Sequence, residues 1–169
     1  SKATVAELLK KFPNLTGLRI HSPHLTKIDD TWLTSFITAK KSLNVISIRD
    51  ANKVSAVSLK LLFAKFGSFL QEVDIRGIKV DPECLYSMFK LLSAKCSTLR
   101  FSYVDSPLII IQRMIRLNRS LCSNLKDFSF TMAKQYYGAK QIQKMDLALD
   151  KVLPLLNKFF PSVRRLSLE

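Results

Sequence analysis

A four-residue phrase recurs along the chain and constrains its fold more than any other feature. Cys96–Leu99 and Cys122–Leu125 each contain a cysteine, two small polar residues and a leucine, and they begin 26 residues apart. Phe12–Leu15 and Phe160–Val163 have a similar form with phenylalanine in the first position. Self-similarity at a period of about 20 to 50 residues is the signature of a solenoid, in which each unit packs on its neighbours. The sequence therefore predicts a repeat protein.

Six anchor residues end these phrases and set the repeat. They are Leu15, Leu43, Leu70, Leu99, Leu125 and Val163, at intervals of 28, 27, 29, 26 and 38 residues. Apolar residues follow each anchor three and five positions later, and this alternation predicts short strands at 15–20, 43–48, 70–75, 99–104, 125–130 and 163–168. The exception is Ser102, which stands where the fourth strand should carry a large apolar residue. A one-residue register slip there, which would exchange the two faces of that strand, is the alternative.

Helical periodicity fills the segments between the predicted strands. Helices are expected at 3–11, 29–41, 55–66, 81–92, 107–121 and 142–159. Asp29 and Asp81 stand where helix N-caps belong, because a carboxylate there accepts hydrogen bonds from free backbone N–H groups. The last interval is about ten residues longer than the others, so we expect a longer loop within an irregular repeat at 132–160. Units of one strand and one helix indicate a single α/β domain over residues 1–169.

Composition narrows the class of protein further. The 169 residues include 27 basic and 13 acidic side chains, and the formal net charge of +14 favours acidic partners. With 47% hydrophobic residues the chain is not a disordered tail. Its longest apolar runs, such as Leu108–Ile111, are too short to span a bilayer. Because repeats stand at both ends of the sequence, we expect a piece of a longer solenoid.

The three cysteines indicate a cellular compartment rather than a site. Cys84, Cys96 and Cys122 are odd in number and have no metal-ligand spacing. We expect them to be reduced, buried, small hydrophobic residues of an intracellular protein, either cytoplasmic or nuclear.

Three segments lead to a family resemblance. Ile28–Phe36, Val54–Leu59 and Val80–Leu85 each place an apolar residue before a polar helix start and a leucine or phenylalanine on the helix. With the anchor phrases, they resemble the leucine-rich repeat, and the cysteine-containing subtype of F-box proteins is closest. The resemblance covers nearly the whole chain. It implies a curved solenoid with parallel strands on the concave face and helices on the convex face.

The same resemblance implies a role in binding rather than in catalysis. Proteins of this kind recognise a substrate or partner within a larger assembly, such as a ubiquitin ligase. The chain has no F-box-like segment, so recruitment of an adaptor is not predicted for it. Open solenoid ends can pair, so a homodimer through these ends is a further expectation.

The first functional hypothesis places a protein partner on the concave face. Side chains that alternate out of the strands would form this surface, and by formal charge they are nearly neutral and slightly acidic in the middle. Phe101 and Tyr103 would be adjacent exposed aromatic anchors, and the aspartates around them would suit a basic or polar peptide. The predicted partner-binding residues are Arg49, Asp74, Arg76, Phe101, Tyr103, Asp105 and Asp127.

The second hypothesis places nucleic acid or another polyanion on the basic helical face. Arg113, Arg116 and Arg119 are spaced at i, i+3 and i+6 of one predicted helix, and such a stripe would bind phosphates with a steep salt dependence. No stacking aromatic residues are interleaved with these arginines. A simple solvated face is therefore the competing interpretation.

No catalytic, metal or cofactor site is expected. His21 and His24 flank a Ser-Pro turn without the cysteines or carboxylates that would complete a zinc site. Asp29 and Asp30 lie at a helix start, where capping explains them, and the four glycines form no phosphate-binding loop. The sequence therefore predicts a non-enzymatic binding protein without a cofactor.

Overall fold

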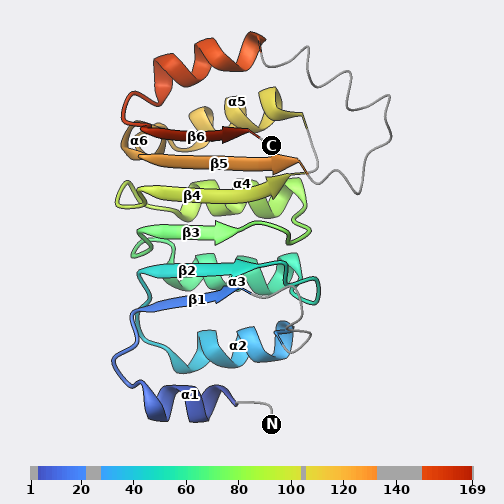
Figure 1. The fold of residues 1–169 in the computed structure, drawn as a ribbon, viewed down its shortest axis with the longest axis vertical. Coiled ribbons are helices and arrows are strands. Elements are labelled where there is room, and N and C mark those ends of the chain that lie inside the picture. The colour runs from blue at the N-terminus through green and yellow to red at the C-terminus, as the bar shows by residue number, and fades with distance from the viewer. Residues whose placement is uncertain (1–3, 22–27, 104–105, 133–149, 169) are drawn as a thin grey trace.

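The computed structural model describes residues 4–21, 28–103, 106–132 and 150–168. Its central element is a sheet of parallel strands that follow one another in chain order. Within this part of the chain one six-stranded sheet has the order β1-β2-β3-β4-β5-β6 (Figure 1). The strands are β1 (Gly17–His21), β2 (Val45–Arg49), β3 (Glu72–Ile75), β4 (Thr98–Tyr103), β5 (Asp127–Met132) and β6 (Arg165–Leu168). Each strand pairs in parallel with the next. The predicted α/β class and the solenoid-like arrangement are confirmed.

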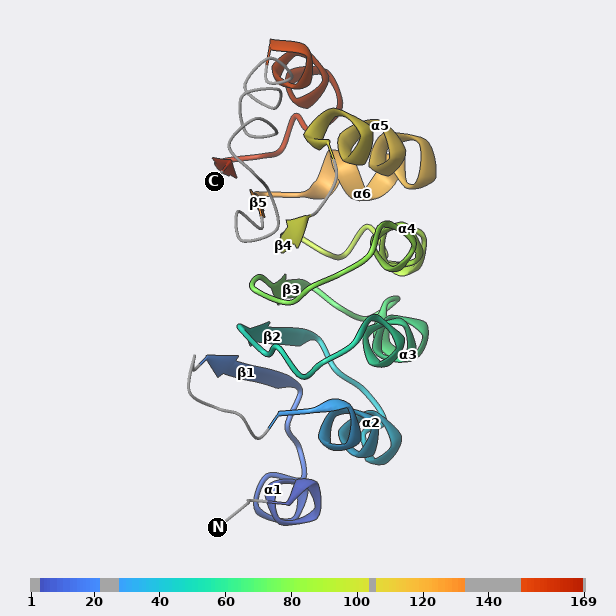
Figure 2. The same ribbon diagram turned by 90° about the vertical axis from the view of Figure 1, so that its right-hand side faces the viewer.

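Helices connect the strands and lie on one side of the sheet. They are α1 (Val5–Lys11), α2 (Asp30–Ala39), α3 (Ala56–Phe66), α4 (Pro82–Leu91), α5 (Pro107–Leu117) and α6 (Arg119–Asn124), and residues 150–159 are also helical. Figure 2 shows the strands on the inner side of a shallow arc and the helices on the outer side. We call these sides the concave and the convex face.

The helix starts follow from the capping residues. The carboxylate of Asp29 accepts a hydrogen bond from the Trp32 backbone N–H at 2.8 Å, and that of Asp81 accepts one from the Cys84 N–H at 2.7 Å. The fifth predicted helix is instead divided into α5 and α6 at Asn118. This side chain caps α6 and also donates to the carbonyls of Phe89 and Leu92 at 2.9 and 2.6 Å, so it ties α6 to the preceding repeat.

The register of β4 differs from the principal prediction. Leu99 pairs with Val73 and Phe128, while Phe101 pairs with Ile75 and Phe130. The anchor of the fourth repeat is therefore Cys96, which is fully buried like the neighbouring anchors, and Leu99 is the first inward residue of the strand. The register differs by three residues from the predicted one, rather than by the single-residue slip considered at Ser102, and because this number is odd the two faces of β4 are exchanged.

A backbone ladder supports this alignment. The residue after each anchor accepts hydrogen bonds from the next repeat. The carbonyl of Asn44 accepts from the N–H of Gln71 at 2.7 Å, and that of Gln71 accepts from the N–H of Ser97 at 2.9 Å. Ser97 directly follows Cys96, so the cysteine occupies the position that leucine or valine holds in the other repeats.

The core lies between the sheet and the helices. Inward side chains of β2 to β5 are buried with the facing residues of α2 to α5, and a group of phenylalanines packs together in the C-terminal half. The ring of Phe101 packs against those of Phe89, Phe128 and Phe130, with centroid separations of 5.6, 6.1 and 6.2 Å. Leu166 on the last strand remains 39% exposed, because β6 pairs on one side only within the described part of the chain.

Two predictions of segment structure lie wholly or partly beyond the described residues. The long loop of the irregular repeat falls largely in 133–149, which the structure does not describe. The end of the last predicted helix is confirmed by residues 150–159.

Candidate functional site

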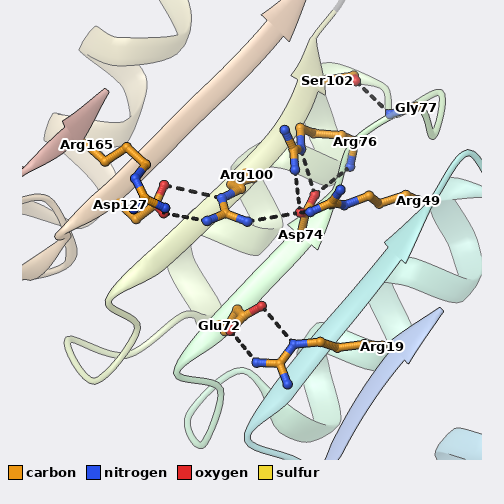
Figure 3. Close-up of polar contacts among 10 residues, drawn as sticks. All are labelled: Arg19, Arg49, Glu72, Asp74, Arg76, Gly77, Arg100, Ser102, Asp127 and Arg165. Carbon is orange, nitrogen blue, oxygen red and sulfur yellow. Dashed lines mark hydrogen bonds and ion pairs between the residues drawn. The ribbon is translucent and has the colours of Figure 1, made fainter. Parts of the chain in front are cut away.

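Outward side chains of the strands form rows across the concave face. The pairing register aligns Arg19, Ser47, Asp74, Arg100, Ser129 and Ser167 in one such row. Beside it, a second row contains Gly17, Val45, Glu72, Thr98, Asp127 and Arg165. Charged members of these rows, with Arg49 and Arg76, form what we call the arginine–carboxylate network. Its members are Arg19, Arg49, Glu72, Asp74, Arg76, Arg100, Asp127 and Arg165 (Figure 3).

Asp74 on β3 is the centre of the network, and its side chain is 0% exposed. Its carboxylate accepts hydrogen bonds from Arg49 Nε at 2.8 Å and from Arg76 Nε and Nη2 at 3.0 and 2.8 Å. Nη1 of Arg100 approaches it at 3.5 Å. Burial alone would raise the pKa of Asp74, but the hydrogen bonds and charge of Arg76, with the charge of Arg49, hold it below its ordinary value. The carboxylate is therefore ionised and fixes guanidinium groups from three successive repeats.

Asp127 on β5 is a second, smaller centre. Its side chain is 14% exposed, and it accepts from Arg100 Nε at 3.2 Å, from Arg100 Nη2, and from Arg165 Nη1 at 3.3 Å. Arg100 thus bridges Asp127 and Asp74. The hydrogen bond to Asp127 and the two negative charges raise the pKa of Arg100 despite its burial. The bridge joins β3, β4 and β5 into one polar surface.

The third contact lies nearer the N-terminal end. Arg19 on β1 reaches across β2 and donates to Glu72 on β3 through Nη2 at 2.7 Å and Nε at 3.3 Å. The side chain of Arg19 is nevertheless 62% exposed. This hydrogen bond raises the pKa of Arg19.

The predicted concave residues divide into three groups. Arg49, Asp74, Arg76 and Asp127 do come together in the network. Phe101 does not belong to the face: it is 0% exposed in the core, and the prediction that it is an exposed aromatic anchor is wrong. Tyr103 has its backbone in β4, but its side chain lies outside the description, as does the whole of Asp105.

The central member that sequence reasoning missed is Arg100. The predicted register, with Leu99 as the anchor, pointed the Arg100 side chain toward the helices. In the structure Arg100 alternates with the inward residues Leu99 and Phe101 and therefore points outward. With Arg100 included, the network has five arginines and three carboxylates among the described residues. The described network is therefore basic. The predicted near-neutral set also counted Asp105 and Glu169, which lie outside the described residues, so the charge of the whole face stays a prediction.

Small hydroxyl side chains complete the surface. The Ser102 hydroxyl oxygen accepts a hydrogen bond from the Gly77 N–H at 2.8 Å, so the residue that disrupted the predicted pattern secures the turn after β3. Within the described part of the structure, the buried hydroxyls of Ser129 and Thr131 have no hydrogen-bond partner. Both lie on β5, beside Arg100 and Ser102 in the register.

The basic stripe of the second hypothesis lies on the convex side. Arg113, Arg116 and Arg119 are all exposed. The guanidinium carbon of Arg113 lies 5.5 Å from the centre of the Tyr86 ring, and that of Arg119 lies 4.9 Å from the centre of the Phe159 ring. Packing on a ring occupies one face of these two groups. The stripe is divided, because Arg119 belongs to α6 and the other two belong to α5.

The cysteines are buried and free of disulfides, as predicted. Burial raises the pKa of Cys84 to about 11 and the pKa values of Cys96 and Cys122 to about 12. Thiols held so far from ionisation are poor nucleophiles at neutral pH. Among the described residues no group of three histidine, cysteine, aspartate or glutamate side chains could hold a metal ion. His24 lies outside them.

A search of the helices in the described segments found none with the length and apolar character needed to cross a membrane. Comparison with protein-family models, curated proteins and solved structures finds no match to this chain.

Proposed function

We propose that this protein is a non-enzymatic recognition module whose concave face binds a protein partner. By its resemblance to leucine-rich repeats, it would act as the partner- or substrate-binding part of a larger intracellular assembly, such as a ubiquitin ligase. The observation that carries the proposal is the arginine–carboxylate network, whose two groups of contacts, Arg19 with Glu72 and the cluster around Asp74 and Asp127, lie on one face between β1 and β6.

Two properties of the network favour protein recognition. Arginine is one of the residue types that dominate interface energy, because its planar group combines several donors with an apolar surface. The guanidinium groups of Arg49, Arg76 and Arg100 are already held by Asp74. Groups fixed before binding lose less conformational entropy when a partner arrives, so more of the contact energy remains as affinity.

Steric substitutions on this face provide the experiment. Val45 and Thr98 point outward in the same row, are partly exposed and belong to no ion pair of the described network. Val45→Trp and Thr98→Trp add bulk to the concave face without changing its charge. Arg116→Trp adds similar bulk to the convex face and serves as the control.

The readout is capture of proteins from a nuclease-treated lysate by the tagged full chain. We expect a defined protein that binds the natural chain and the Arg116→Trp variant but not the two concave variants. Circular dichroism should show the same fold for all four proteins. If the concave variants retain the captured protein, or if the only material captured is nucleic acid, the proposal is wrong.

The convex stripe of Arg113, Arg116 and Arg119 stays a prediction for polyanion binding. It is less favoured, because two of its three guanidinium groups are packed on aromatic rings. Comparison of oligonucleotide binding by the natural chain and the Arg116→Trp variant, without nuclease, tests it, and equal binding would mean that the stripe is only a solvated face.

A further inference from the structure

We propose that the concave face recognises an acidic peptide segment, rich in aspartate or glutamate, of its partner. This inference rests on the proposed function and specifies the chemistry of the ligand. It reverses the expectation of a basic or polar peptide that the sequence pattern suggested.

The first argument is the difference in exposure between the positive and the negative groups of the network. The carboxylate of Asp74 is entirely buried and that of Asp127 nearly so, whereas every arginine of the network is more exposed than the carboxylate it contacts. A molecule that approaches this face therefore contacts the guanidinium groups first, because the carboxylates lie deeper and are already paired with arginines. The resulting field attracts negative charge.

The second argument is the number of unused donors. A guanidinium group has five N–H donors, and Arg19 and Arg165 each direct only one or two of them at a carboxylate within the described contacts. Their side chains are 62% and 75% exposed. Carboxylates bind such groups in the planar, two-bond geometry that arginine favours.

The positions of the two most exposed arginines set the length of the ligand. Arg19 is on β1 and Arg165 is on β6, five strand spacings apart. At about 4.8 Å per spacing this is about 24 Å, which an extended peptide of about seven residues spans. We therefore infer an acidic segment of at least this length lying along the sheet, across the strands.

Nucleic acid is the other anionic ligand to consider, and the same face favours it less. Proteins that bind single strands combine basic groups with aromatic side chains on which bases stack. The outward positions of the strands hold no phenylalanine, tyrosine or tryptophan among the described side chains, since Phe101 faces the core. Electrostatic attraction to phosphates remains, so an oligonucleotide is the necessary competitor in the test.

The experiment measures fluorescence anisotropy with a labelled octaglutamate peptide as the probe. A labelled oligonucleotide of eight thymidines provides the comparison at similar charge. Two double variants each remove two exposed positive charges: Arg19→Gln/Arg165→Gln on the concave face and Arg113→Gln/Arg116→Gln on the convex face. Circular dichroism verifies that all the proteins are folded.

We expect the natural chain to bind octaglutamate more tightly than the oligonucleotide. The concave double variant should weaken peptide binding by about tenfold or more, and the convex one by less than about twofold. Equal losses from both variants, preference for the oligonucleotide, or absence of peptide binding would each overturn the inference. The proposed function would still stand if Thr98→Trp abolishes partner capture while Arg19→Gln/Arg165→Gln does not, so the two failures can be told apart.

Discussion

The concave and convex faces of this solenoid hold their arginines in different ways. On the concave face Arg49, Arg76 and Arg100 share the buried carboxylate of Asp74, whereas on the convex face Arg113 and Arg119 lie over aromatic rings. A buried carboxylate fixes the position of an arginine and neutralises part of its charge. A ring leaves the charge in place and covers one side of the group. The net charge of +14 alone does not distinguish these two situations.

The largest loss of stability is expected for a substitution on the inward, core-facing side of the strands. Phe101→Ala should lower the free energy of unfolding by about 4 kcal/mol, because it leaves a cavity among packed rings. Phe101→Leu retains most of the volume and should cost much less. Urea unfolding followed by circular dichroism measures both. A loss of unfolding free energy below about 1 kcal/mol for Phe101→Ala would indicate that Phe101 is exposed, as in the register predicted from the sequence.

The next effect concerns the carboxylate that distinguishes the two faces. Asp74→Asn should destabilise the protein by about 3 kcal/mol at pH 7, since it leaves three arginines without their buried counter-charge. Glu83→Gln is the control, because this carboxylate on α4 is exposed and only 3.7 Å from Lys60. Its effect should remain within about 0.5 kcal/mol. Comparable losses of unfolding free energy for both variants in urea would mean that the buried network stabilises the fold no more than an exposed ion pair does.

The same carboxylate predicts a dependence on pH. The pKa of Asp74 is lower in the folded than in the unfolded protein, so its stabilisation is fully present above the unfolded value near 3.8 and is lost as pH falls through the folded pKa. The melting temperature of the natural chain should therefore fall more steeply below about pH 4 than that of Asp74→Asn. Parallel curves for the two proteins would show that Asp74 does not contribute in this way.

The smallest expected effects compare one exposed arginine from each face. Arg19→Ala and Arg113→Ala should each cost less than about 1 kcal/mol, since exposed ion pairs and exposed cation–π contacts are weak. The loss for Arg19→Ala should shrink in 1 M salt, where the Debye length is only about 3 Å. Urea unfolding at low and high salt measures it. A loss for Arg19→Ala that is larger in high salt would contradict its assignment to an ion pair.

Most of the fold could be predicted because its signals are local. Alternation after each anchor marks a strand, and Asp29 and Asp81 mark helix starts through their own side-chain hydrogen bonds. These signals depend on residues within one turn or one strand. They do not depend on contacts between repeats.

The register of β4 could not be fixed in this way, because two residues fit the anchor position. Leu99 matched the other anchors by residue type, whereas Cys96 occupies the position in the structure as a small buried hydrophobe. The alternation of Leu99 and Phe101 with Arg100 and Ser102 contained the correct signal. It was outweighed by the likeness between the two cysteine phrases.

The arginine–carboxylate network could be predicted only from the correct register of the strands. Asp74 contacts Arg49 and Arg100, which lie 25 and 26 residues away in the sequence. Their proximity follows only once the repeats are stacked in the right alignment. The three-residue difference in β4 therefore put Phe101 on the predicted concave face in place of the central Arg100.

Site-specific cross-linking tests the central claim most directly. A photoreactive benzoylphenylalanine would replace Val45 or Thr98 on the concave face, or Arg116 on the convex face, in the full chain expressed in cells. We predict that the two concave positions cross-link to the same protein, that this protein contains an acidic segment, and that Arg116 does not reach it. Cross-linking of a partner from Arg116 alone would contradict the account and would place function on the convex helices.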